Sequence, residues 1–174
     1  MGTLQPRKNL LVLLDALAQI KDRSLKLVLI GGKGWFYEEI YKKIEALGLQ
    51  DRVIFPGYIP DEALPLWYHA AQILVFPSVY EGFGMPILEA MACDTPVICS
   101  NASAMPEAAG SAALLFDPHN TAELVNHIES VLHNPNQAAT MRQQGHEQVK
   151  KFSWADTGQK TAEAYQLALS RKSA

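Results

Sequence analysis

Two glutamates, Glu81 and Glu89, flank a loop that contains two glycines and leads into a predicted helix ending near Cys93. The loop follows an apolar run at residues 73–76. Bare N–H groups at a strand-to-helix turn, together with the helix dipole, favour a bound anion such as phosphate. Helical side chains lean toward the helix N-terminus, so Glu89 can reach the mouth of the loop. The two carboxylates could then accept hydrogen bonds from hydroxyl groups on either side of the phosphate.

Positive charge for such an anion is concentrated near the start of the chain, where Arg7 and Lys8 are adjacent. Residues 1–50 have a net charge of +3 and residues 51–135 a net charge of −9. An anion cradle, two cations and two hydroxyl-binding carboxylates together describe a site for a nucleotide-sugar. A second interpretation remains open at this point: Glu81 caps the helix and Glu89 is a solvated helical residue.

A further glycine-rich loop at residues 31–34 contains Lys33 and is by itself expected to be mainly a tight turn that needs positive φ. The glycines of the loop between Glu81 and the predicted helix fit neither the P-loop pattern nor the dinucleotide-binding pattern. The sequence therefore favours neither a nucleoside triphosphate nor a dinucleotide as the ligand.

Composition excludes several other classes of protein. The chain has 174 residues, of which 48% are hydrophobic and 19% charged, which is typical of one globular domain. Its net charge of −3 argues against a general nucleic-acid binder. Cys93 and Cys99 form no disulfide framework and are expected to be small buried hydrophobes, and no Cys/His cluster has zinc spacing. No apolar run approaches the roughly 18–20 residues of a membrane span, and we expect a cytoplasmic domain without a metal.

Five short apolar runs alternate with helical patterns along the chain. Runs that are apolar throughout are typical of parallel strands covered on both faces, and strands alternating with helices indicate right-handed βαβ units. The sequence thus predicts an α/β fold with a doubly wound, Rossmann-like parallel sheet in a single domain over residues 1–174. The predicted strands are residues 25–30, 52–55, 73–76, 96–99 and 113–116.

Helix signals lie between and after these runs. Patterns at residues 10–17, 37–47 and 62–71 indicate helices, and Pro65 requires the third of them to begin nearby. Asn120 with Glu123, and Ser153 with Asp156, have the spacing of helix N-caps. On the last helix, Trp154 and Tyr165 are expected to be packing residues.

No apolar strand precedes the first loop, because Met1 to Leu4 lead straight into it. In a doubly wound sheet such a loop normally follows a buried strand. We therefore expect the first strand to be missing or supplied by a partner, and the chain to come from a longer protein.

The sequence from Glu81 to Ala92 closely resembles the E-x7-E signature of the retaining GT-B glycosyltransferases of family 4, the group 1 glycosyl transferases. The resemblance covers nearly the whole chain. It extends to ordered motifs at residues 2, 6–9, 31, 55–58, 77–78, 95–98, 106–110 and 152–154.

The resemblance implies one half of a GT-B fold, the C-terminal donor-binding domain, without the acceptor-binding N-terminal domain. In such a domain Lys8 binds the donor diphosphate. Many members pair this lysine with an arginine at the position of Thr3, and Arg7 is the residue that could compensate. Asp94 stands where the family usually has glycine, at a turn to which we assign no functional role.

The resemblance to the E-x7-E signature also implies roles for residues within it. Glu81, as the catalytic residue, would contact hydroxyls of the transferred sugar. Gly82, Phe83 and Gly84 would offer backbone N–H groups, and Glu89 would hold the ribose.

The implied function is transfer of a sugar, with retention, from a nucleotide-sugar of the GDP-mannose or UDP-glucose type to a glycan or lipid-linked acceptor. No cofactor and no metal are implied. The absent N-terminal domain would bind the acceptor and could place the protein at a membrane surface. Two alternatives are a nucleotide-sugar-binding module that is inactive by itself and a fragment of a GT-B sugar-nucleotide epimerase, which the E-x7-E match disfavours.

Overall fold

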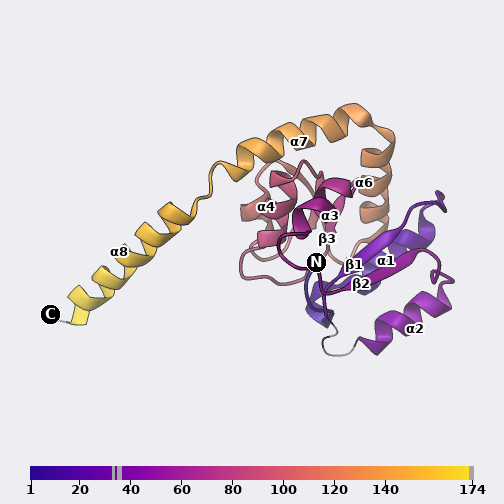
Figure 1. The fold of residues 1–174 in the computed structure, drawn as a ribbon, viewed down its shortest axis with the longest axis horizontal. Helices are drawn as coiled ribbons and strands as arrows, with labels where there is room; N and C mark the ends of the chain where they lie inside the picture. The colour runs from indigo at the N-terminus through magenta and orange to yellow at the C-terminus, as the bar shows by residue number, and fades with distance from the viewer. Residues whose placement is uncertain (33, 35–36, 173–174) are drawn as a thin grey trace.

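The computed structural model describes residues 1–32, 34 and 37–172, with side chains up to residue 170. Parallel strands lie between two layers of helices, and a last helix extends away from the body (Figure 1). The described strands are β1 (Leu27–Ile30), β2 (Val53–Gly57), β3 (Leu74–Phe76), β4 (Val97–Ser100) and β5 (Ala113–Phe116). The helices are η1 (Pro6–Lys8), α1 (Leu10–Gln19), α2 (Glu38–Ala46), α3 (Leu64–Ala70), α4 (Met85–Ala92), α5 (Met105–Ala109), α6 (Thr121–His133), α7 (Pro135–Val149) and α8 (Trp154–Lys172).

The predicted α/β class is confirmed, but the described strands form two hydrogen-bonded sheets instead of one. β1 pairs with β2, and β3, β4 and β5 pair in that order, all in parallel. A cavity of about 530 Å³ lies between β1 and β3 and is lined by both strands, by α1 and by α3. The two sheets are therefore joined by side-chain packing and not by strand pairing.

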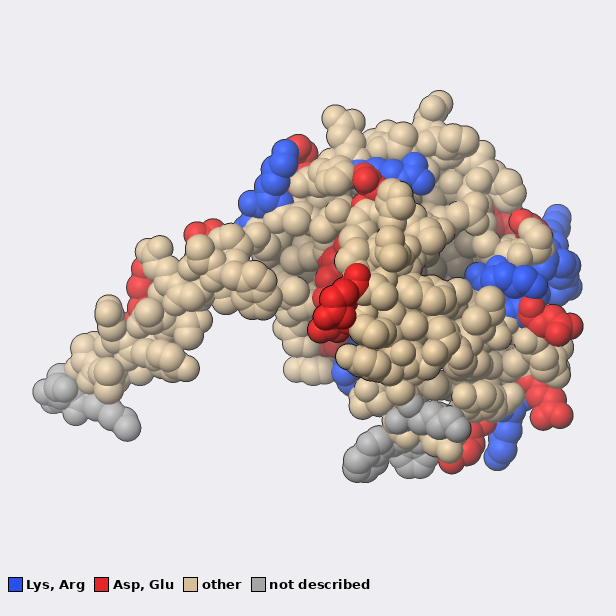
Figure 2. All heavy atoms as spheres, viewed as in Figure 1, with Lys and Arg blue, Asp and Glu red and all other residues tan. Residues whose placement is uncertain are grey.

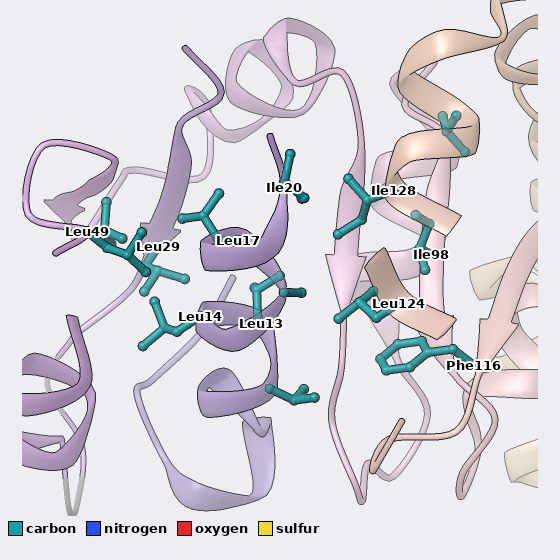
Figure 3. Packing of buried hydrophobic residues seen from close by; sticks show 14 of the residues in the cluster. Leu13, Leu14, Leu17, Ile20, Leu29, Leu49, Ile98, Phe116, Leu124 and Ile128 are labelled. Carbon is teal, nitrogen blue, oxygen red and sulfur yellow. The ribbon is translucent and has the colours of Figure 1, made fainter. Parts of the chain in front are cut away.

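Apolar packing on one face bridges the two sheets. Leu13, Leu14 and Leu17 of α1 lie between Leu29 on the β1 side and Phe116 on the β5 side (Figure 3). All five are buried, with exposed fractions of 5% or less. A second apolar cluster on the opposite face packs α3, α4 and α5 against β3 and β4. Helices thus cover both faces, as a doubly wound sheet requires.

The predicted helix starts are confirmed in their main contacts. Asn120 Oδ1 accepts a hydrogen bond from Glu123 N at 3.1 Å, and Ser153 Oγ accepts one from Asp156 N at 3.0 Å. The reciprocal half of a capping box is absent at Asn120 among the described contacts, because Glu123 accepts from the amide of Asp117 instead. Helices α5 and α7 were not predicted from the sequence.

The prediction that Trp154 and Tyr165 are packing residues is wrong for this structure. Their exposed fractions are 79% and 69%, and α8 projects away from the rest of the chain (Figure 1). The spacing of the two rings does place them on a helix, but no described element covers that helix.

One expectation at the end of α4 needs correction, and Asp94 in the same turn makes structural contacts. Cys99 is fully buried, which raises the pKa of its thiol to about 12, but Cys93 is only partly buried. Asp94, with a φ of 61°, connects α4 to α7. Its carbonyl accepts a hydrogen bond from Arg142 Nε at 3.0 Å, and its Oδ1 lies 2.6 Å from His146 Nε2.

Charge is unevenly distributed over the surface. On the face shown in Figure 2, Lys and Arg gather at the right-hand edge, over the N-terminal part of the chain around α1 and β1. Across the described residues, no helix is both long and apolar enough to cross a lipid bilayer.

The start of the chain is held against the end of β1 by a close backbone approach. Gly2 N donates to Ile30 O at 2.9 Å, and Leu4 N donates to Gly32 O at 3.1 Å. Gly31 has a φ of 140°, and a Cβ atom added there would lie 2.0 Å from Gly2 O. Glycine is therefore required at position 31 by both its backbone conformation and the space available.

We expect Gly31→Ala to lower the free energy of unfolding by more than about 3 kcal/mol, because strain and a steric clash add together. The matched control is Gly48→Ala, since Gly48 also has a positive φ, of 64°, but has open space where the Cβ would be. This control should cost only about 1–2 kcal/mol. Chemical denaturation of the two variants measures the difference, and equal losses would contradict a tight contact between Gly2 and Gly31.

Candidate functional site

The loop between β3 and α4 presents backbone N–H groups at the start of a helix. Gly84 is the N-cap of α4 and has a φ of 102°, a conformation that favours glycine. The amides of Gly82, Phe83 and Gly84 donate to no other residue in the part of the chain that the structure describes. The Phe83 ring packs edge-on against Phe152, with ring centroids 5.5 Å apart, which anchors the loop. The loop therefore leaves three N–H groups at the start of α4 without a partner among the described residues.

Glu81 lies at the centre of a cluster of donors. Its Oε1 atom lies 2.6 Å from Arg7 Nη1 and 2.7 Å from Lys8 Nζ, and it accepts a hydrogen bond from Ser78 Oγ at 2.9 Å. All three of these contacts are made to Oε1. Among the described residues, these contacts leave the Oε2 atom without a partner.

The environment of Glu81 favours its charged form. Burial by itself would raise the pKa of this carboxyl, but the hydrogen bonds from Arg7, Lys8 and Ser78 outweigh burial and hold the pKa below its ordinary value. Glu81 is therefore an anion held by two cations in this structure.

Arg7 and Lys8 reach the loop because η1 lies beside it. Val79 N donates to Arg7 O at 2.9 Å, and Arg7 Nη1 donates to Tyr80 O at 3.2 Å. Lys8 Nζ lies 4.8 Å from the centre of the Phe76 ring at the end of β3. The side chain of Lys8 is 12% exposed and that of Arg7 is 43% exposed, so Lys8 is the deeper of the two cations.

Glu89 lies on α4 and has one defined partner. The hydroxyl of Tyr68, on α3, donates to its Oε2 atom at 2.7 Å. Glu89 is half-buried, whereas Tyr68 is only 3% exposed. The interpretation of Glu89 as a freely solvated residue therefore does not hold.

The two glutamates and Lys8 lie around the end of β3. Lys8 lies over the ring of Phe76 at the end of that strand, and Glu81 and Glu89 belong to the loop and the helix that follow it. The cations and both carboxylates thus share one region at the carboxyl end of β3, where ligands bind in open α/β sheets.

Sequence reasoning missed four residues that shape the site. Ser78 and Tyr68 hold the two glutamates directly. Ser103 Oγ donates to Glu81 O at 2.7 Å, and the Ser100 hydroxyl donates to Ser78 O. The spacing of Ser78 three residues before Glu81 was a usable signal. The other three are brought in only by the fold.

Two features singled out in the sequence contribute less to the site than Arg7 and Lys8 do. Thr3 is exposed and donates no side-chain hydrogen bond to another described residue, so the second cation of the site is Arg7. Lys33, in the second glycine-rich loop, lies outside the described residues. Within the described ranges, no group of three or more His, Cys, Asp or Glu side chains is arranged to hold a metal ion.

Known proteins resemble this chain over almost its full length. Residues 1–148 match the family described as "Glycosyl transferases group 1". The chain is 40% identical over 169 residues to the O-antigen chain mannosyltransferase B of Escherichia coli, covering 95% of this chain and 44% of that relative.

Two solved structures share the fold. The sucrose-phosphate synthase of Thermosynechococcus elongatus has a TM-score of 0.86 and 31% identity, covering 98% of this chain and 45% of that chain. HepE of Anabaena in complex with UDP-glucose has a TM-score of 0.84 and 28% identity, covering 95% and 48% respectively. This chain therefore spans less than half the length of these three relatives.

We expect the contribution of Glu81 to stability to decline as the pH falls. A carboxyl whose pKa is lower in the folded protein stabilises the fold above its unfolded pKa, and that stabilisation is lost as the pH falls through the folded value. The free energy of unfolding of the natural chain, minus that of Glu81→Gln, should thus decrease from pH 7 to below about pH 4. Urea denaturation of both proteins at several pH values measures this quantity. A difference that stays constant or grows on acidification would show that the two cations do not stabilise the carboxylate.

Proposed function

Because the chain belongs to the group 1 glycosyl transferases, we propose that it binds the nucleotide-sugar donor of such an enzyme. It would be the C-terminal, donor-binding half of a two-domain GT-B protein. The transferred sugar keeps its anomeric configuration in this proposal. Acceptor binding is assigned to the part of the relatives that this chain does not span.

One observation carries the proposal: among the described residues, each glutamate has one carboxylate oxygen held by the protein and one without a partner. Three donors meet at Oε1 of Glu81, and Tyr68 donates to Oε2 of Glu89. A carboxylate held in this way is pre-oriented to accept hydrogen bonds from hydroxyl groups. Two such carboxylates on either side of a cationic, amide-lined loop match a ligand that has hydroxyl groups at both ends of a diphosphate.

We assign the donor one orientation in the site. The diphosphate would lie at Lys8 and Arg7, with the amides of residues 82–84 at the N-terminus of α4. The ribose would bind to Glu89 and the transferred sugar to Glu81. Because Lys8 now pairs with Glu81, the diphosphate must share that cation or replace the carboxylate as its partner.

The same arrangement supports group transfer. As the bond between the sugar and the diphosphate breaks, negative charge accumulates on the leaving phosphate. Lys8 is 12% exposed, so its charge is screened less than that of a solvated lysine. Lys8, Arg7 and the loop amides would stabilise this charge most strongly in the transition state, as catalysis requires. Glu81 would hold the hydroxyls of the sugar while the acceptor attacks.

Among possible donors we favour GDP-mannose and then UDP-glucose. The E. coli relative is named a mannosyltransferase, and the HepE structure contains UDP-glucose. The acceptor would be a glycan or a lipid-linked glycan. A chain that contains the donor site alone would act as a nucleotide-sugar-binding module, and binding is therefore the property to measure.

The central test separates the two glutamates. Glu89→Gln should weaken GDP and GDP-mannose about equally, since both contain the ribose. Glu81→Gln should weaken GDP-mannose and leave GDP nearly unchanged, since only the sugar-nucleotide reaches Glu81. Each loss should be about 10- to 150-fold, as for one charge-assisted hydrogen bond. NMR titration measures both ligands, with the UDP and UDP-glucose pair run in parallel.

Glu163→Gln, on the projecting helix α8, is the matched control and should leave the affinity for every ligand unchanged. Equal losses of affinity for GDP and for GDP-mannose in the Glu81→Gln variant would mean that Glu81 supports the loop and does not contact the sugar. An absence of binding by the natural chain to all four nucleotides would refute the proposal itself.

We also expect donor binding to persist without a divalent cation. Lys8, Arg7 and the loop amides supply countercharge for the diphosphate. Calorimetric titration of GDP-mannose in the presence of EDTA and in excess magnesium should give the same affinity. Binding that is lost in EDTA and restored by magnesium would contradict this expectation.

A further inference from the structure

Tyr68 connects a buried part of the fold to the glutamate assigned to the ribose. It lies on α3, and its hydroxyl donates to Glu89 Oε2 on α4 at 2.7 Å. The residue is 3% exposed and belongs to the apolar cluster that packs α3 and α4 against β3. Its ring is therefore fixed by packing, and its hydroxyl is directed at a half-buried carboxylate.

The backbone of Tyr68 is also fixed. Thr95 Oγ1 donates to Tyr68 O at 2.6 Å, and the Thr95 side chain is itself buried, with 2% exposure. Thr95 lies in the turn between α4 and β4. Helix α3 is thus joined to this turn by the hydroxyl of Thr95 and to α4 by the hydroxyl of Tyr68.

The hydroxyl of Tyr68 acts as a donor at every ordinary pH. Burial first, and the neighbouring Glu89 carboxylate second, raise the pKa of this phenol far above its usual value. A phenol that stays protonated next to a carboxylate can only donate to it. The contact therefore does not depend on ionisation of the phenol.

We propose that Tyr68 is a positioning residue for ribose recognition: by holding Oε2 of Glu89, it fixes the carboxylate so that Oε1 faces the nucleotide. The inference rests on the proposed function, since it is Glu89 that contacts the ribose. A free glutamate loses side-chain freedom when it binds a ligand, and a carboxylate that is already held has less to lose. Tyr68 would thus raise the affinity for nucleotides without touching them.

Tyr68→Phe tests this, because it removes the hydroxyl and keeps the packed ring. The probes are GDP, UDP and inorganic pyrophosphate, followed by NMR titration. We expect GDP and UDP to bind about three- to tenfold more weakly to the variant. Pyrophosphate has no ribose, and its affinity should stay unchanged. In a Glu89→Gln background, Tyr68→Phe should cause no further loss, because the group that it positions is already altered.

Two controls separate positioning from general damage to the fold. Tyr165→Phe, on the exposed face of α8, should change neither the thermal stability nor any affinity. Thr95→Val removes the backbone contact and should lower the thermal stability while leaving the Tyr68 hydroxyl in place. Two results would overturn the proposal. In one, Tyr68→Phe weakens the binding of pyrophosphate as much as that of GDP. In the other, Tyr68→Phe lowers the affinity for GDP as much in the Glu89→Gln background as in the natural chain.

A ligand-free crystal structure of Tyr68→Phe distinguishes this inference from the proposed function. We expect the Glu89 carboxylate to leave its position or to take several positions. A carboxylate that remains in place would overturn the positioning role, even if nucleotides bind to the natural chain. If the carboxylate moves but the natural chain binds no nucleotide, the contact positions Glu89 and the proposed function is wrong.

Discussion

The site depends on the meeting of Arg7, Lys8 and Ser78 at one oxygen of Glu81. This contact joins the start of the chain to the loop after β3, more than seventy residues later. A partly buried carboxylate without such partners would be costly to ionise, and two neighbouring cations without a carboxylate would repel each other. The carboxylate of Glu81 and the two cations therefore stabilise each other when no ligand is bound. The same mutual neutralisation keeps the cations close to the helix N-terminus, where an anion is favoured.

Both glutamates are held by neighbouring donors, but the donors differ in kind. Glu81 is held by charge and Glu89 by a neutral hydroxyl from a packed ring. The first contact involves two long and flexible side chains, so a competing anion can displace it. The second involves a side chain that packing fixes, so it is more rigid. A ligand that brings its own negative charge can therefore rearrange the partners of Glu81 while Glu89 stays in place.

The strands and the site loop could be predicted from the sequence because their signals are local. Continuous apolar runs identified the parallel strands, and the residues from Glu81 to Glu89 identified the loop and helix. Helix α7 was missed because its buried residues, Ala138, Met141, Gly145 and Gln148, include two that are not apolar side chains. Tyr68 could not have been assigned from spacing, because its partner is 21 residues away on another helix. On α8, the spacing of Trp154 and Tyr165 identified a helix but not the high exposure of the two rings.

The boundary between the two sheets, where β1 and β3 line the cavity without pairing with each other, affects how the two sheets can move. Among the described strands, only β4 pairs with another strand on both sides. β1 pairs with β2 and, at its end only, with the backbone of Gly2, and β3 has an edge on the cavity. Amide hydrogens of β4 should therefore exchange with solvent more slowly than those of β1, which can open with β2 as a separate cooperative unit. Gly2 and Leu4, just before η1, pair with the end of β1, while Glu81 follows β3. Movement of the two sheets relative to each other would thus change the distance between the two cations and Glu81. The contacts of Glu81 with these cations would therefore be the first to be disturbed by local opening.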